Sequence, residues 1–133
     1  TKFFAWLYNS NSNKIQSEHY DRSKVLRKFY RNGVVETPFG REMETDNFHA
    51  LNYLLQSTSS DNCIKQANKI HRFLRNKKSN VAWMVHDSVI LDMSFEDRQL
   101  LPQIEEIFED TALGRFSSSL SIGKNYGNMK EVK

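Results

Sequence analysis

A histidine and a carboxylate lie side by side between two apolar segments in the second half of the chain. His86 and Asp87, followed by Ser88, separate the β-rich segments VAWMV and VILDM. Two such segments around a short polar stretch predict a tight β-hairpin that holds these side chains at its tip. A carboxylate on a rigid strand end suits a hard divalent cation such as Mg²⁺, which prefers oxygen ligands. Asp87 is therefore a candidate metal ligand, and an ordinary aspartate turn beside a solvated histidine is the alternative.

This hairpin offers a cation only one carboxylate. Asp92 follows Asp87 by an odd number of residues, so it points to the opposite face of the same strand. A second metal-binding carboxylate must therefore come from elsewhere.

Polar and aromatic side chains at helical spacing form a second set of candidates. His49, Asn52 and Gln56 step by three and four residues, so they share one helix face. Asn and Gln can contact base edges without carrying charge, and the alternative is an ordinary solvated face. Phe4 and Tyr8 are one helical turn apart and could stack on bases or sugars, or could belong to the core.

The elements that must position these residues follow from periodicity and turn signals. Apolar spacing predicts two helices within residues 1–32, the second ending at Asn32-Gly33, where glycine supplies a left-handed stop. The segment VVET predicts a short strand that enters a turn at Pro38-Phe39-Gly40, and residues 41–45 return from it.

The remaining elements are one long helix, the hairpin, a second helix and a last strand. Asp46 or Asn47 caps a long amphipathic helix that runs to Arg75. Its apolar stripe consists of Leu51, Leu54, Leu55, Ile64, Ala67, Ile70, Phe73 and Leu74. After the hairpin, Ser94 with Asp97 predicts a capping box and a helix to about Asp110. An edge strand is expected from Phe116 to Lys124, followed by a loose tail.

Length and composition bound the class of protein. With 133 residues the chain can bury one modest core, and a net charge of +3 with a pI near 9.0 is compatible with nucleic acid. Cys63 is the only cysteine, which excludes an internal disulfide and a thiolate zinc cluster and favours an inert core thiol. No membrane-spanning run or signal peptide is present, so a cytoplasmic protein of a bacterial or phage-infected cell, without a membrane partner, is expected.

Four segments in a fixed order resemble the C-terminal portion of the polymerase domain of family A DNA polymerases, the bacterial DNA polymerase I and phage type. They read FAWLYN, GVVETPFGRE, HALNYLLQS and VHDSVILDM, and a closing LSIGKNYG resembles the family's last strand. The resemblance implies an α+β fold in which an antiparallel palm-type sheet packs against helices. It assigns residues 1–32 to part of the fingers and residues 33–133 to the palm.

The resemblance also implies roles for individual residues. Phe4 would pack on the sugar of the incoming deoxynucleoside triphosphate, and Tyr8 would stack near the templating base. Arg41, Asn52 and Gln56 would contact the primer-template DNA, the two amides in its minor groove.

At the palm turn, His86 would lie near the primer end and Asp87 would be one of two metal-binding aspartates. The implied reaction is attack of the primer 3′-hydroxyl on the α-phosphate, assisted by two Mg²⁺ ions.

Several departures from the family pattern shape the expected function. Ser88 replaces the glutamate that usually follows the His-Asp pair, and Ala5 and Asn9 replace helix glycines. The sequence also lacks the upstream strand with the other catalytic aspartate, so the chain alone is expected to be inactive and to need an N-terminal polymerase fragment or subunit. A non-catalytic nucleic-acid-binding or assembly module and part of a single-subunit RNA polymerase are the alternatives.

Overall fold

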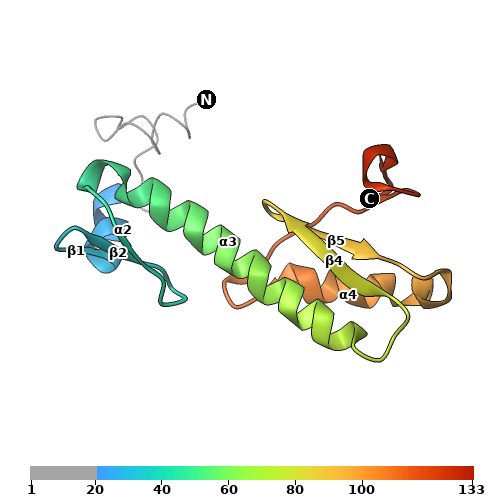
Figure 1. Cartoon of the computed structure of the whole chain (residues 1–133). Coiled ribbons are helices and arrows are strands. Elements are labelled where there is room, and N and C mark those ends of the chain that lie inside the picture. The colour runs from blue at the N-terminus through green and yellow to red at the C-terminus, as the bar shows by residue number, and fades with distance from the viewer. Residues whose placement is uncertain (1–20) are drawn as a thin grey trace. The chain divides into compact units, whose positions relative to one another are not determined.

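The computed structural model describes residues 21–133, which combine helices with small antiparallel sheets (Figure 1). This agrees with the α+β class. The chain divides into two compact units between Asp61 and Asn62, and we call these the first and the second unit. The predicted boundary at residues 32 and 33 separates fingers from palm, and it remains a prediction because the compact units do not address it. None of the described helices combines the length and the apolar character needed to cross a bilayer.

In the first unit, helix α2 (Arg22–Phe29) leads into a three-stranded antiparallel sheet. Asp21 caps α2, since its carboxylate accepts a hydrogen bond from the Lys24 amide. The sheet has the order β1 (Tyr30–Arg31), β2 (Val34–Glu36), β3 (Glu42–Glu44).

The expected end of the second helix at Asn32-Gly33 was wrong. The helix ends at Phe29, and Asn32-Gly33 forms the two-residue turn between β1 and β2, in which Arg31 pairs with Val34. Both turn residues have positive φ, +51° and +81°. Asn-Gly is the preferred sequence for such a hairpin turn, so the glycine serves the hairpin and not the helix.

The expected turn after VVET is present. Gly40 N–H donates to the Thr37 carbonyl at 2.9 Å, with Pro38 and Phe39 as the central residues. The hydroxyl oxygen of Thr37 accepts from the Arg41 amide at 3.1 Å, which ties the start of the turn to its end.

Helix α3 (Asn47–Leu74) begins in the first unit and continues into the second. Asp46 caps it, because its carboxylate accepts from the His49 amide at 2.8 Å, as the sequence predicts. Leu26, Ala50 and Leu51 form the core of the first unit. Two members of the expected apolar stripe, Leu55 and Ile64, are exposed, so that part of the prediction was wrong.

The second unit contains a β-hairpin beside a short helix (Figure 1). Its core is formed by Ile70 and Leu74 of α3 with Ile104, and Val81, Leu91 and other partly buried side chains pack against them. Its elements are β4 (Asn80–Val85), β5 (Ser88–Asp92), the 3₁₀ helix η1 (Phe95–Leu100), α4 (Leu101–Glu109), β6 (Asp110–Thr111), β7 (Gly114–Arg115), β8 (Ser121–Ile122), η2 (Tyr126–Asn128) and β9 (Lys130–Glu131).

The predicted capping box does not form. The buried Asp97 carboxylate accepts from the amide and the hydroxyl of Ser79, both at 2.8 Å, and not from the Ser94 amide. The Ser94 amide donates to the Ser79 hydroxyl oxygen at 2.9 Å. Ser79, which lies just before β4, thus occupies the position expected for the Asp97 carboxylate.

The C-terminal part also differs from the expectation. Within the predicted edge strand, only Ser121 and Ile122 belong to a strand, β8. Their partner is β9 in the supposedly loose tail, with Ile122 opposite Lys130. The tail is therefore an ordered part of the second unit.

Candidate functional site

His86 and Asp87 occupy the tip of the β4–β5 hairpin. Val85 pairs with Ser88, so the turn has two residues and Ser88 already belongs to β5, one residue earlier than expected. His86 has a φ of +54°, a left-handed conformation that glycine or asparagine adopts more readily. Both side chains are exposed, and Asp87 makes no hydrogen bond or ion pair with another described residue. Its carboxylate is therefore available to an external cation or donor.

A cavity of about 410 Å³ lies behind this tip in the second unit. Asp87 and Ser88 line it together with Glu105 of α4 and with Ser117 to Ser119. The remaining lining residues are all apolar: Ile70, Val89, Leu91, Leu101, Ile104, Phe108 and Leu120. The cavity therefore combines an apolar interior with hydroxyl and carboxylate groups contributed from several elements.

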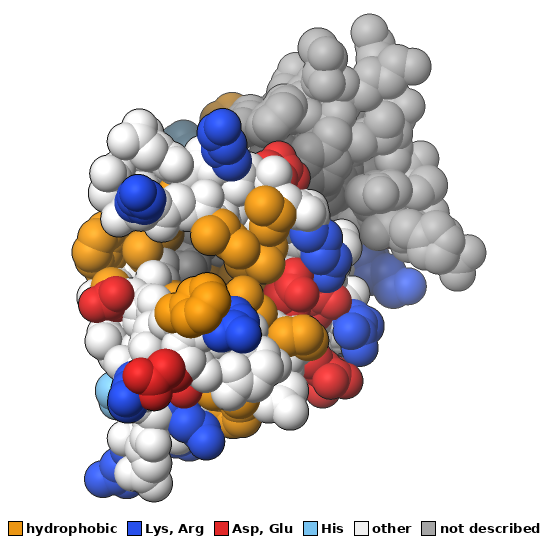
Figure 2. All heavy atoms as spheres, turned by 90° about the vertical axis from the view of Figure 1, so that its right-hand side faces the viewer, with side chains coloured by type: hydrophobic (Ala, Val, Ile, Leu, Met, Phe, Trp, Pro, Cys, Tyr) orange, Lys and Arg blue, Asp and Glu red, His pale blue; other side chains and the backbone are white. Residues whose placement is uncertain are grey.

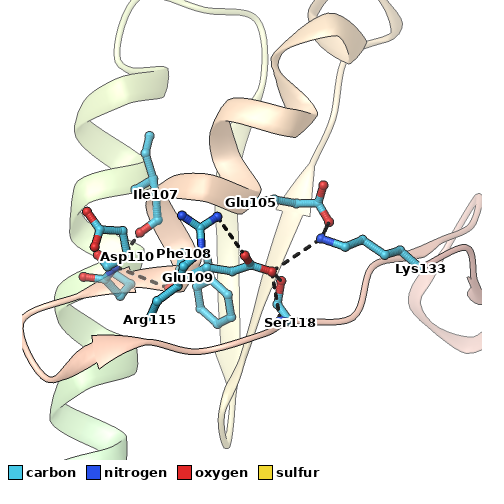
Figure 3. A network of polar contacts seen from close by, with 9 residues as sticks. Glu105, Ile107, Phe108, Glu109, Asp110, Arg115, Ser118 and Lys133 are labelled. Atoms are coloured by element: carbon cyan, nitrogen blue, oxygen red, sulfur yellow. Dashed lines mark hydrogen bonds and ion pairs between the residues drawn. The ribbon is translucent and has the colours of Figure 1, made fainter.

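A polar network around Glu109 holds the serine segment against α4 (Figure 3). The buried Glu109 carboxylate accepts from the amide and the hydroxyl of Ser118, both at 3.0 Å. Arg115 Nη2 lies 3.2 Å from Glu109 Oε2, and Lys133 Nζ lies 3.4 Å from Glu109 Oε1. The hydrogen bonds from Ser118, aided by Lys133, lower the pKa of Glu109 to about 2. Glu109 is therefore ionised near neutral pH.

The same network extends to Glu105, one of the two carboxylates that line the cavity. Lys133 Nζ lies 3.2 Å from Glu105 Oε1, and this contact, with Glu109, raises the pKa of Lys133. These residues were missed by the sequence analysis. No local signal could have found them, because the network joins α4 to residues from six to 28 positions later in the chain.

The described residues alone do not satisfy a Mg²⁺ ion. They contain no cluster of three or more His, Cys, Asp or Glu side chains arranged to hold a metal. Asp87 offers one carboxylate, whereas Mg²⁺ requires an octahedral set of oxygen ligands.

Cys63 is a buried thiol in the second unit. Burial, aided by the negative charge of Asp87, raises the pKa of Cys63. A thiol that stays protonated is a poor nucleophile, which agrees with the expected inert role.

The predicted DNA contact Arg41 pairs with a carboxylate in the first unit. Its Nε donates to Asp61 Oδ2 at 3.2 Å, and its Nη2 contacts the other carboxylate oxygen. The Arg41 side chain is 48% exposed and that of Asp61 is 12% exposed. Asp61 thus holds the guanidinium group in place while about half of the Arg41 side chain stays exposed to solvent.

The predicted amide pair also lies in the first unit, on α3. Gln56 Nε2 donates to Asn52 Oδ1 at 3.0 Å, so the two side chains do share one face, as their spacing indicates. His49, on the same stripe, is engaged with the helix cap, and its hydrogen bond to the Asp46 side chain lowers the pKa of Asp46. Asn52 and Gln56 are thus the residues of this helix face whose side chains could bind an external ligand.

The candidate residues are brought together only in part. His86 and Asp87 are adjacent in the second unit, and Asn52 pairs with Gln56 in the first. The predicted nucleotide-binding residues, Phe4 and Tyr8, lie outside the described residues.

Comparison with known proteins gives no match to a family model, to a curated protein or to a solved structure.

Proposed function

We propose that the chain is the C-terminal part of a DNA-directed DNA polymerase of the family A type, completed by an N-terminal fragment or subunit. The observation that carries the proposal is the position of His86-Asp87. Within the motif order that resembles the family, this pair occupies a two-residue hairpin turn, and His86 there has a positive φ that glycine would adopt with less strain. A conformation that costs free energy at an exposed polar tip supports a functional role for the side chains.

In this proposal the β4–β5 hairpin is part of a palm sheet. Asp87 would supply one metal ligand, and the upstream polypeptide would supply the other aspartate. Two bound Mg²⁺ ions would stabilise charge on the reacting phosphate. His86 would lie near the primer end, and Phe4 and Tyr8 would contact the deoxynucleoside triphosphate and the templating base.

The first unit would contribute contacts to the primer-template. Asn52 and Gln56 offer neutral donors and acceptors at helical spacing, which suits the hydrogen-bond acceptors that all correct base pairs present in the minor groove. Arg41, held by Asp61 with half of its side chain exposed, would contact a phosphate.

Primer extension tests the proposal directly. The chain is assayed with Mg²⁺ and deoxynucleoside triphosphates, alone and mixed with the polypeptide encoded immediately upstream. We expect extension only in the mixture, and we expect Asp87→Ala to abolish it without weakening DNA binding. Asp92→Ala is the matched control, because Asp92 is an exposed aspartate at the far end of the same hairpin. Unchanged extension by Asp87→Ala would refute the metal role.

The alternative of a non-catalytic nucleic-acid-binding module is favoured by the single carboxylate at the hairpin tip. Ser88 stands where the resemblance leads one to expect a glutamate, and the described residues do not complete a metal site. DNA binding without extension in the mixture would support this module. Preference for ribonucleotides in the mixture would instead support a single-subunit RNA polymerase.

A further inference from the structure

Two aromatic side chains from distant parts of the second unit form an exposed pair. The ring centroids of Trp83 and Tyr126 lie 6.1 Å apart at an interplanar angle of 66°. Trp83 is 50% exposed and Tyr126 is 52% exposed. Half of the surface of each side chain is thus open to a ligand.

The loop that carries Tyr126 is compact and basic. Ile122 pairs with Lys130, and the residues between them include Lys124 but no acidic side chain. Lys124 and Lys130 are exposed and make no ion pair with other described residues. The loop approaches itself closely, since a Cβ added to Gly123 would lie 2.5 Å from the Asn128 carbonyl oxygen. This packing limits the positions available to the loop.

We infer that Trp83, Ile122, Lys124, Tyr126 and Lys130 form a binding surface for single-stranded DNA, which we call the aromatic surface. The inference rests on the proposed function for the choice of DNA and adds a second contact region, at the Trp83–Tyr126 pair. Unpaired bases expose faces that stack on aromatic rings, and their phosphates attract nearby lysines.

The charge of this surface favours a nucleic acid over a protein partner. Lysine is depleted in protein interfaces, and this surface carries two lysines beside a small apolar area. Duplex DNA could use the lysines but not the rings, because its base faces are already stacked. Figure 2 shows hydrophobic side chains interspersed with both basic and acidic ones on the face that it draws.

The test measures binding of the full chain to fluorescein-labelled oligo(dT) by anisotropy. Trp83→Ala and Tyr126→Ala are each expected to weaken binding about tenfold, the typical effect of removing one stacked base contact. Trp83→Phe keeps a ring, so it should retain most of the affinity and also guard against a folding defect. Phe95→Ala is the control, because Phe95 is 76% exposed in the same unit and lies under the Arg98 guanidinium group, outside the aromatic surface.

A second measurement concerns the lysines. Replacing Lys124 and Lys130 with glutamine should reduce the slope of log affinity against log salt by about 0.7 for each phosphate contact that is lost. A stacking role for the rings predicts that the aromatic variants leave this slope unchanged.

Three results would overturn the inference. These are an absence of oligo(dT) binding, binding that does not change in the aromatic variants, and aromatic variants that impair only the association with the upstream polypeptide. The last result would make the surface a protein interface. Failure of the proposed function is separately visible, because Asp87→Ala and primer extension do not enter this assay.

Discussion

Replacing His86 with glycine is expected to stabilise the second unit while lowering primer extension by the assembled enzyme. His86 adopts a φ of +54° at the hairpin tip, and its side chain is exposed. For an L-residue the left-handed conformation costs about 1–2 kcal/mol, whereas glycine adopts it freely. Glycine loses more backbone entropy on folding, about 0.5–1 kcal/mol. The expected net gain in the free energy of unfolding therefore lies between zero and about 1.5 kcal/mol.

Thermal unfolding can measure this gain. A change of about 1 kcal/mol shifts Tm by about 4–8 °C in a domain of 60–100 residues. Trp83 lies in the same hairpin as His86, so its fluorescence reports on the second unit, and a Trp6→Phe background leaves it as the only tryptophan.

The matched variant is His86→Ala, which removes the imidazole but keeps a Cβ. It should unfold at about the temperature of the unmodified chain, while its primer extension should fall as far as that of His86→Gly. Equal Tm values for the glycine and alanine variants would refute the argument from strain. Full activity of both variants would refute the functional role of the imidazole.

Three further predictions concern the framework of the second unit. Gln66 is buried, and its side-chain amide donates to the carbonyls of Ile107, Phe108 and Asp110 at the end of α4. Gln66→Leu should lower the free energy of unfolding, measured in urea, by about 1–3 kcal/mol, because these buried carbonyls lose their donor. An unchanged urea midpoint would contradict this prediction. The pKa of Glu109 is lowered to about 2 from an ordinary 4.5, so its stabilising contribution is complete above pH 4.5 and is lost as the pH falls toward 2. Urea midpoints measured across this range should depend less on pH in Glu109→Gln than in the unmodified chain. An equal pH dependence in both would show that Glu109 is not the group responsible. Gly123→Ala places a Cβ against backbone atoms. Hydrogen exchange at the β8–β9 amides should therefore become faster, while that of the α4 amides stays unchanged. Faster exchange in both elements would contradict a local effect at Gly123.

Patterns confined to a few neighbouring residues predicted structure well. Two β-rich apolar segments around His86-Asp87 predicted the hairpin, and Asp46 predicted the start of α3. The Asn32-Gly33 turn shows the limit of such signals. A left-handed glycine can end a helix or close a hairpin, and the sequence alone did not decide between these two uses.

Features set by distant contacts could not be read from the sequence. Asp97 is spaced correctly for a capping box with Ser94, but the buried Ser79, 18 residues earlier, competes for its carboxylate. Arg41 was predicted as a DNA contact without its partner, because Asp61 lies 20 residues away on another element. In both cases the local sequence pattern identified an important polar residue, but its hydrogen-bond partner is determined by tertiary contacts with residues far away in the sequence.

The division of the candidate residues between the two units has a consequence for the proposed reaction. Arg41, Asn52 and Gln56 belong to the first unit, and His86 and Asp87 belong to the second. The side-chain hydrogen bonds of Arg41, Asn52 and Gln56 to other described residues stay within the first unit. A polymerase reaction nevertheless requires one primer-template to contact both sets at once. Duplex DNA is stiff over the length of such a site, so the proposal requires one nearly straight duplex to reach both sets of residues.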